Sequence, residues 1–135
     1  MRLEEQIQII PRNLIQDERG WFLKVITGKE DHLPQYTGEV YLTMAKPGQA
    51  KGGHFHRRAN EWFTIIEGES VLKLEDTTTH EKMDIHLSFK DALTVVVPPN
   101  VAHVFVNSGN ANCIVLAYTD QLYDPSDTIK HEFDL

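Results

Sequence analysis

Apolar and polar residues alternate at every second position along much of this chain. In residues 83–88, Met, Ile and Leu alternate with Asp, His and Ser, which is the pattern of a β-strand with one buried face. Residues 40–44 and 71–74 alternate in the same way, whereas 62–66 and 113–118 are short runs rich in β-branched and aromatic residues. These runs predict strands and are too short for buried helices, so we expect an all-β fold.

Turn sequences separate the predicted strands at short intervals. Lys-Pro-Gly occupies 46–48, Pro-Pro-Asn occupies 98–100 and Asn-Ser-Gly-Asn occupies 107–110. Many short strands with this spacing are typical of a β-sandwich or β-barrel. The chain has 135 residues, which predicts one domain spanning 1–135, and we find no convincing amphipathic helix, repeat or linker.

Composition excludes several classes of function. The formal net charge is −7, which argues against general nucleic-acid binding. No apolar segment approaches the length needed to cross a membrane, so we expect no membrane partner. Cys113 is the single cysteine, so no intramolecular disulfide can form. A cytoplasmic protein is the expectation.

The histidines carry the densest chemical signal. His54 and His56 are two positions apart and would point to one face of a strand. Glu61 opens the next apolar run, so a hairpin would bring its carboxylate to this pair, and His103 follows a proline turn at a predicted strand start. Three imidazoles and a carboxylate form a plausible site for a divalent transition metal, such as Zn, Mn, Fe or Ni, with open coordination positions. The remaining histidines lack such companions and are expected on the surface: His32, His80, His86 and His131.

This spacing resembles the two signature motifs of the cupin superfamily. The first motif, Gly-x5-His-x-His-x4-Glu-x6-Gly, is matched at each fixed position by Gly48, His54, His56, Glu61 and Gly68. The second, Gly-x5-Pro-x-Gly-x2-His-x3-Asn, is matched by Pro98, His103 and Asn107, and this chain has Ala92 and Asn100 in place of its glycines. Asn can adopt the positive φ that such a turn needs. The resemblance implies a double-stranded β-helix, or jelly-roll barrel, with metal ligands in its mouth.

Three further segments are similar to cupins that act on nucleotide-linked sugars. Residues 17–22 resemble the Asp-x-Arg-Gly-x-Phe segment of cupins that act on nucleotide-linked deoxysugars. Residues 51–56 resemble the Arg-Gly-x-His stretch of dTDP-4-keto-6-deoxyhexose 3,5-epimerases and 3,4-ketoisomerases. Residues 117–125 resemble the ketoisomerases and, more closely, the C-terminal cupin domain of capsular enzymes that epimerise a UDP-4-keto sugar at C3. The 3,5-epimerases have one histidine in this stretch and need no metal, whereas this chain has the complete ligand set. The resemblance therefore implies an isomerase that inverts C3 or moves the ketone of a 4-keto sugar, in cell-surface polysaccharide synthesis.

Site roles follow from this resemblance and from charge. His54 falls at the position of the epimerase base, so it would be either the base or a metal ligand. If it is a ligand, Lys51, Tyr118 and Tyr123 are the candidates to move the proton. Residues 46–60 contain four cations and no acid, which suits an anionic diphosphate, and we expect Arg19, Lys51 and Arg57 to bind the substrate.

Two other function classes stay open at this point. A cupin of this kind could bind a sugar nucleotide without catalysis, as a sensor, or it could be an Fe(II)-dependent dioxygenase. A homodimer is expected, because such barrels commonly pair sheet edges and exchange N-terminal strands. Residues 120–135 are expected to pack over the barrel mouth or against a partner subunit.

Overall fold

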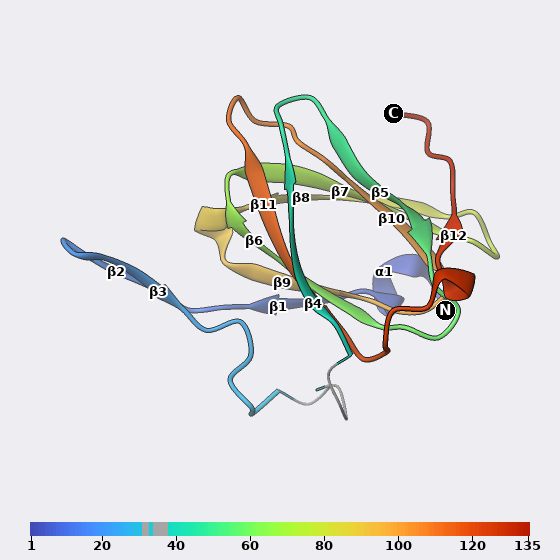
Figure 1. Cartoon of the computed structure of the whole chain (residues 1–135), viewed down its shortest axis with the longest axis horizontal. Helices are drawn as coiled ribbons and strands as arrows, with labels where there is room; N and C mark the ends of the chain where they lie inside the picture. The colour runs from blue at the N-terminus through green and yellow to red at the C-terminus, as the bar shows by residue number, and fades with distance from the viewer. Residues whose placement is uncertain (31–32, 34–37) are drawn as a thin grey trace.

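Two antiparallel sheets face each other in this protein (Figure 1). The computed structural model describes residues 1–30, 33 and 38–135. The first sheet has the order β1 (Gln8–Pro11), β9 (Leu93–Val97), β6 (Glu61–Glu67), β11 (Cys113–Thr119), β4 (Val40–Ala45). The second has the order β12 (Ile129–Lys130), β5 (Ala50–Phe55), β10 (Val101–Val106), β7 (Glu69–Asp76), β8 (Lys82–Ser88). The expected all-β jelly-roll fold is confirmed.

The core lies between the two sheets. It is built from alternate apolar side chains of β6, β7, β9 and β10, among which Phe63, Leu72, Val95 and Phe105 are almost completely buried. The short helix α1 (Leu3–Gln6) was not predicted from the sequence. Its Leu3 packs into the core and has no exposed surface. Burying apolar surface at this scale is the main stabilising contribution to such a barrel.

In strand β4 the apolar side chains face outward and the polar ones face the interior, opposite to the usual pattern of an alternating strand. Its apolar residues Val40, Leu42 and Met44 face outward and are exposed, whereas Tyr41 and Thr43 face the barrel interior. Alternation alone favours burial of the apolar set. The structure places Tyr41 and Thr43 inside, where both line a hollow and Tyr41 also packs against the core.

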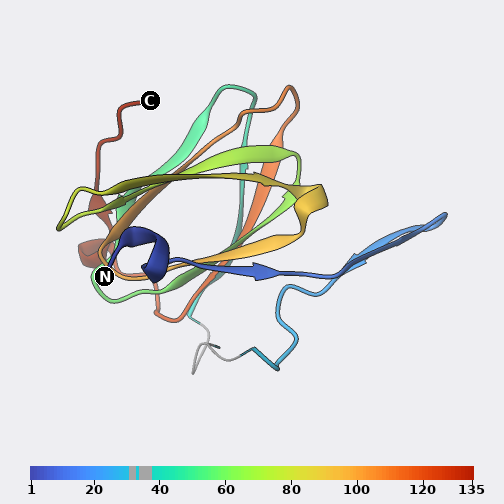
Figure 2. The same cartoon turned by 180° about the vertical axis from the view of Figure 1, so that it is seen from behind.

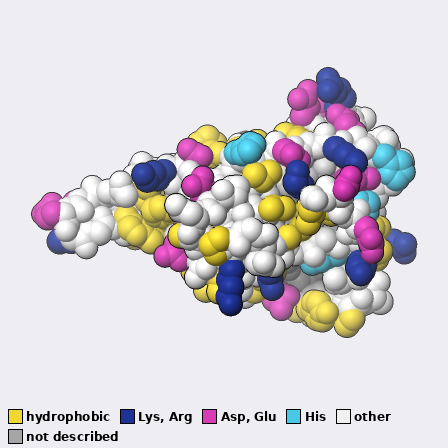
Figure 3. Space-filling view, turned by 90° about the horizontal axis from the view of Figure 1, so that it is seen from above, with side chains coloured by type: hydrophobic (Ala, Val, Ile, Leu, Met, Phe, Trp, Pro, Cys, Tyr) yellow, Lys and Arg dark blue, Asp and Glu magenta, His cyan; other side chains and the backbone are white. Residues whose placement is uncertain are grey.

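A hairpin of β2 (Leu14–Asp17) and β3 (Gly20–Leu23) projects away from the barrel (Figures 1 and 2). We call residues 14–23 the arm. Its side chains Ile15, Trp21 and Phe22 are each more than half exposed, and hydrophobic atoms lie where the arm leaves the barrel (Figure 3). This hairpin makes its own two-stranded sheet and was not predicted from the sequence.

The two turns that depart from the family glycines both adopt left-handed backbone. Asn100 has φ 67°, as expected for the residue that follows Pro98-Pro99. Ala92 has φ 50° and ends the 3-10 turn η1 (Phe89–Asp91). A left-handed residue with a Cβ costs roughly 1–2 kcal/mol, less for Asn than for Ala. The motif geometry is therefore kept without its glycines.

The histidines outside the motifs differ in their surroundings. His80 and His86 are exposed, as expected, and His32 lies outside the described residues. His131 was expected on the surface, and this was wrong: its ring is mostly buried, packs against Phe55, and its Nε2 lies 3.3 Å from Glu75 Oε1. Among the described residues, no helix is long and apolar enough to cross a membrane.

Candidate active site

A bulge in β5 sets the direction of the side chains at the barrel mouth. His54 pairs with His103, but the register then shifts, so that Gly52 pairs with Val104 and Lys51 with the buried Phe105. Because paired residues share a face of the sheet, the shift turns Lys51 inward, beside His54. Gly52 has φ 110°, and a Cβ there would lie 3.1 Å from the carbonyl oxygen of His103, so only glycine fits without a shift of backbone.

The predicted metal ligands come together from three strands. His103 lies on β10, His56 follows β5 directly, and Glu61 begins β6. Glu61 Oε1 lies 2.9 Å from His56 Nε2 and 3.1 Å from His103 Nε2. Ring nitrogens of His54, His56 and His103 all lie within 4.8 Å of one another. The imidazoles and the carboxylate thus lie together, as expected from the spacing of His54, His56 and Glu61 and from the second motif for His103.

The orientation of the imidazole rings fits a metal ion. His56 Nδ1 lies 2.8 Å from the carbonyl oxygen of Asp127, and His103 Nδ1 lies 3.4 Å from that of Val101. A carbonyl oxygen only accepts, so in the neutral rings Nδ1 carries the proton and Nε2 keeps its lone pair. Both Nε2 atoms and Glu61 Oε1 are buried, and none makes a hydrogen bond of acceptable geometry. Buried lone pairs that converge in this way are the donor set that a divalent cation would satisfy.

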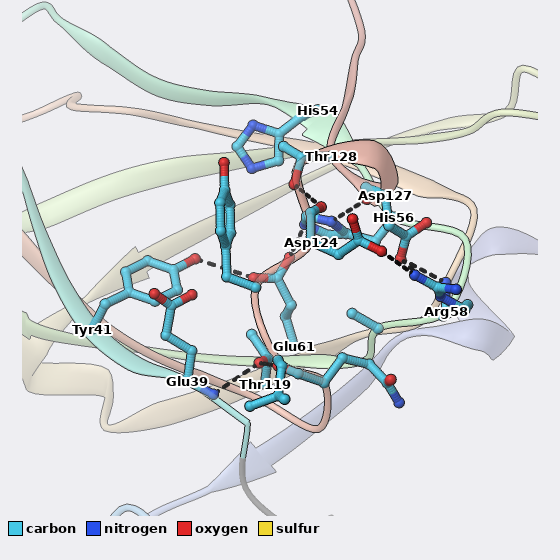
Figure 4. A pocket seen from close by; sticks show the side chains of 14 residues that line it. Glu39, Tyr41, His54, His56, Arg58, Glu61, Thr119, Asp124, Asp127 and Thr128 are labelled. Atoms are coloured by element: carbon cyan, nitrogen blue, oxygen red, sulfur yellow. Dashed lines mark hydrogen bonds and ion pairs between the residues drawn. The ribbon is translucent and has the colours of Figure 1, made fainter.

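Electrostatics around Glu61 keep this carboxyl group ionised. Burial alone would raise the pKa of Glu61, but the imidazoles of His103 and His56 outweigh it and hold the pKa far below its usual range. Burial alone would lower the pKa of His56, and the adjacent Glu61 carboxylate raises it instead. Tyr41 donates its hydroxyl proton to Glu61 Oε2 at 3.1 Å (Figure 4), and burial together with this carboxylate raises the pKa of the phenol.

Two hollows with shared lining residues adjoin this cluster. The outer one has a volume of about 380 Å³ and is walled by the C-terminal segment, including Leu122, Tyr123 and Thr128. The inner one has a volume of about 240 Å³ and reaches Lys51 and His103. Tyr41 and His54 line both hollows. The cluster of ligands therefore lies open to a space large enough for a sugar ring.

His54 differs from the other two imidazoles of the cluster. It makes no contact with Glu61 among the described ion pairs, and it lines both hollows. Figure 4 shows its ring at the outer one. Burial and the neighbouring rings of His103 and His56 lower the pKa of His54 to about 4. The ring is therefore neutral near pH 7 and has a free lone pair for a proton or a metal.

The structure separates the predicted proton-moving residues. Lys51 lines the inner hollow and Tyr123 lines the outer one. The prediction for Tyr118 was wrong: its ring lies on the outer face of the first sheet, stacked on Trp62 with centroids 5.3 Å apart. Tyr118 is on the same face of β11 as Leu116, opposite to the core, and burial raises the pKa of its phenol to about 12.

The predicted substrate-binding arginines do not line these hollows. Arg57 only donates its backbone N–H to Asp127, and Arg58 is the arginine at the pocket wall, where it pairs with Asp124. Arg19 lies on the arm, is highly exposed, and pairs with Asp17 at 2.7 Å. The cationic stretch inferred from residues 46–60 is thus partly neutralised by the C-terminal acids, because the fold adds carboxylates that are distant in sequence.

Several pocket residues were missed by sequence reasoning. Tyr41 is the most important of these, and the only signal for it was its position on the polar side of an alternating strand. Glu39 and Thr119 reach the outer hollow from the paired ends of β4 and β11, where the backbone N–H of Glu39 donates to Thr119 Oγ1 at 3.2 Å. No local motif marks either residue.

Comparison with known proteins identifies the family. Residues 15–129 match the family described as the polysaccharide biosynthesis C-terminal domain. This match covers most of the chain, which therefore belongs to that family. The solved structures that resemble it include sugar-nucleotide isomerases and epimerases of the cupin fold, so the class expected from the motifs is confirmed.

Two curated relatives show moderate similarity. The chain is 25% identical over 108 residues to a UDP-2-acetamido-2,6-beta-L-arabino-hexul-4-ose reductase of Pseudomonas aeruginosa, covering 80% of this chain and 27% of that protein. It thus spans about a quarter of the length of this reductase. It is 24% identical over 114 residues to the spore coat polysaccharide biosynthesis protein SpsL of Bacillus subtilis, covering 81% of this chain and 75% of SpsL.

Solved structures share the fold. A dTDP sugar isomerase of Desulfovibrio desulfuricans superimposes with a TM-score of 0.88 at 20% identity, over 96% of this chain and 86% of that one. The capsular polysaccharide assembling protein CapF of Staphylococcus aureus gives a TM-score of 0.68 at 26% identity, over 91% of this chain and 35% of CapF. The 3,4-ketoisomerase QdtA of Thermoanaerobacterium thermosaccharolyticum gives 0.76 at 21% identity, over 92% of this chain and 86% of QdtA.

Proposed function

We propose that this protein is an isomerase of a nucleotide-linked 4-keto sugar, which inverts C3 or moves the ketone during polysaccharide synthesis. The observation that carries the proposal is the placement of His54, Lys51 and Tyr41 around two hollows with shared lining residues, beside a buried His–Glu cluster. Membership of a polysaccharide biosynthesis family and a fold shared with sugar-nucleotide isomerases support it. We propose the cytoplasm as its compartment, because Cys113 is a free buried thiol.

The chemistry begins with the acidic C3–H of a 4-keto sugar. In this proposal His54 takes that proton, because its neutral ring faces the hollow and makes no contact with Glu61 among the described ion pairs. The product is an enediolate, whose negative charge the Lys51 ammonium can stabilise from the inner hollow. Return of a proton to the opposite face of C3, with Lys51 or Tyr123 as donor, inverts that centre. Proton transfer between the enediolate oxygens and C4 moves the ketone to C3.

A divalent transition ion is the proposed cofactor. His56, Glu61 and His103 would hold it through the buried lone pairs described above, with His54 close enough to join them. When bound, such an ion supplies Lewis-acid polarisation of a substrate oxygen. Tyr41 would keep Glu61 oriented by occupying Oε2 and leaving Oε1 for the cluster.

Hydrogen exchange at C3 tests the proposed reaction. We expect the zinc-loaded protein, incubated in D₂O with a UDP- or dTDP-linked 4-keto sugar, to place deuterium at C3. The physical reason is that an enediolate must take its new proton from a group in exchange with solvent. Mass spectrometry and proton NMR of the sugar measure it.

The other function classes give different results in the same experiment. A sensor would bind the sugar nucleotide without deuterium incorporation, and an oxygenase loaded with Fe(II) would consume O₂ and stop working without it. Either outcome, with the ligand demonstrably bound, would contradict the isomerase. A protein treated with chelator and lacking metal serves as the control for the contribution of the ion.

We also propose that two copies form a homodimer. The exposed outer residues of β4, Val40, Leu42 and Met44, form an apolar edge of the first sheet. The arm carries further exposed apolar side chains and projects away from its own barrel (Figures 1 and 2). A second copy of the chain could cover both surfaces at once. Arg19, on the arm, could then reach a substrate only in the pocket of the other copy.

Sedimentation velocity tests this dimer. Leu42→Asp is expected to convert the dimer to a monomer, because a carboxylate in a closed apolar interface loses its hydration without a partner. His86→Asp, on the exposed face of β8, is the matched control and should sediment like the unmodified protein. A monomeric unmodified protein at micromolar concentration would contradict the dimer.

A further inference from the structure

We infer that Asp127 is a positioning residue for His56: it fixes which ring nitrogen carries the proton and thereby couples the pocket wall to the ligand cluster. The inference rests on the proposed function for the presence of a metal ion, but its central contact exists without one. That contact joins the Asp127 carbonyl oxygen to His56 Nδ1 at 2.8 Å. We call residues 120–131, which contain Asp127, the clamp.

The Asp127 carboxylate holds the clamp to the loop that carries His56. Oδ1 accepts the backbone N–H of Arg57 at 2.8 Å, and Oδ2 accepts that of Arg58 at 3.2 Å. These donors are the two residues that follow His56 directly, and the Asp127 side chain is 12% exposed. One residue thus grips the loop with its side chain and orients the ring with its backbone. Both contacts depend on the same local conformation of the clamp.

That conformation is built into the 3-10 turn η2 (Pro125–Asp127). The Asp124 side chain caps the turn by accepting from the N–H of Ser126 at 2.9 Å, and the N–H of Asp127 donates to the Asp124 carbonyl oxygen at 2.9 Å. Pro125 fixes the first φ of the turn. The carbonyl of Asp127 therefore reaches His56 from a stiff element and not from a freely moving tail.

The rest of the clamp follows the ligand-bearing segment closely. Asp120 accepts both the backbone and the side-chain N–H of Asn60, each at 2.9 Å. Strand β12 pairs with β5 through Ile129–Phe55 and Lys130–His54. Residues 120–131 thus line up antiparallel to 53–60. The same clamp also supplies the wall of the outer hollow.

This arrangement links two events that would otherwise be independent. A ligand that binds in the outer hollow and contacts the clamp can shift the Asp127 carbonyl that orients His56. Binding of a metal ion at His56 Nε2 fixes the ring and thereby stabilises its Nδ1 contact with the clamp. Such coupling is reciprocal, since a metal ion that stabilises the clamp must bind more tightly when the clamp is closed. Partners that orient a ligating imidazole typically change metal affinity 10–100-fold.

Asp127→Ala tests the inference, with Glu132→Gln as the matched control. Glu132 is an exposed carboxylate near the same end of the chain, and its described ion pair is with Lys130. We expect Asp127→Ala to weaken Zn²⁺ binding by about 10–100-fold in competition with a chromogenic chelator. Long-range ¹H–¹⁵N NMR of the metal-free protein, at a pH where His56 is neutral, should show loss of the pure Nδ1–H form. Glu132→Gln should change neither quantity.

The outcomes separate this inference from the proposed function. If the unmodified protein binds no Zn²⁺, the metal part of the proposed function fails, and the His56 tautomer in Asp127→Ala decides the clamp. If Asp127→Ala is folded, keeps the tautomer and binds Zn²⁺ normally, the inference is overturned. If Asp127→Ala does not fold, amide exchange in the unmodified protein decides: Zn²⁺ should slow exchange of the Arg57 and Arg58 amides by about fivefold or more, and an unchanged rate overturns it.

Discussion

Replacing His54 with Asn is expected to lower deuterium exchange at C3 by about 10²–10⁴-fold, the usual contribution of a general base. Zn²⁺ affinity is expected to stay unchanged. The reason is geometric: His54 borders both hollows, whereas the ion pairs with Glu61 are made by His56 and His103. Asn keeps a similar polar shape but cannot take a proton. Exchange is measured by NMR of the sugar and affinity by chelator competition.

His86→Asn is the control for this variant, because His86 is an exposed imidazole on β8. It should exchange C3 at the normal rate. A His54→Asn protein that loses Zn²⁺ together with activity would make His54 a metal ligand, and Lys51 or Tyr123 would then have to move the proton. Normal exchange in His54→Asn would remove His54 from both roles.

His103→Ala is expected to lower Zn²⁺ affinity by more than about 100-fold, beyond the effect of losing an outer-sphere partner. It should also destabilise the fold, by roughly 3 kcal/mol, because removal of a buried ring that packs against Phe63 leaves a cavity. The two effects separate experimentally, since urea denaturation of the metal-free protein reports stability and chelator competition reports affinity.

His80→Ala serves as the comparison for His103→Ala. His80 is an exposed imidazole that also contacts a glutamate, at 3.1 Å from Glu75 Oε2, so it controls for the loss of a histidine–carboxylate pair. It should bind Zn²⁺ normally. Undiminished Zn²⁺ binding by folded His103→Ala would contradict the proposed ligand set.

The barrel and the cluster of His54, His56 and Glu61 were predictable because both depend on short-range spacing. Alternation with period two specifies strands, and closely spaced turns specify antiparallel neighbours. His54, His56 and Glu61 are close in sequence, where the chain passes from β5 in the second sheet to β6 in the first and does not form the expected hairpin. Their proximity still follows from this short connection. His103 is distant in sequence, and its place beside them was implied only by the family motif. The structure then confirmed that the four side chains meet.

Other features depend on contacts that no local pattern encodes. The apolar residues of β4 face outward, against the expectation from alternation, while Tyr41 and Thr43 line the inner hollow. The partner of Arg58 is Asp124, 66 residues further along the chain, and the charge of the mouth could not be read from residues 46–60 alone. Tyr118 was considered as a proton-moving residue, but its side chain lies on the outer face of β11, away from both hollows.

The double glycine of β5 has a consequence for how such a site can diversify. In a regular strand, residues 51 and 54 would point to opposite faces. Position 51 would therefore face the outer surface whenever His54 faces the interior. The extra residue in β5 shifts the register, so that position 51 also lines the inner hollow beside His54. Sequence change at 51 can then retune which substrate charge is recognised while the ligand cluster keeps its geometry.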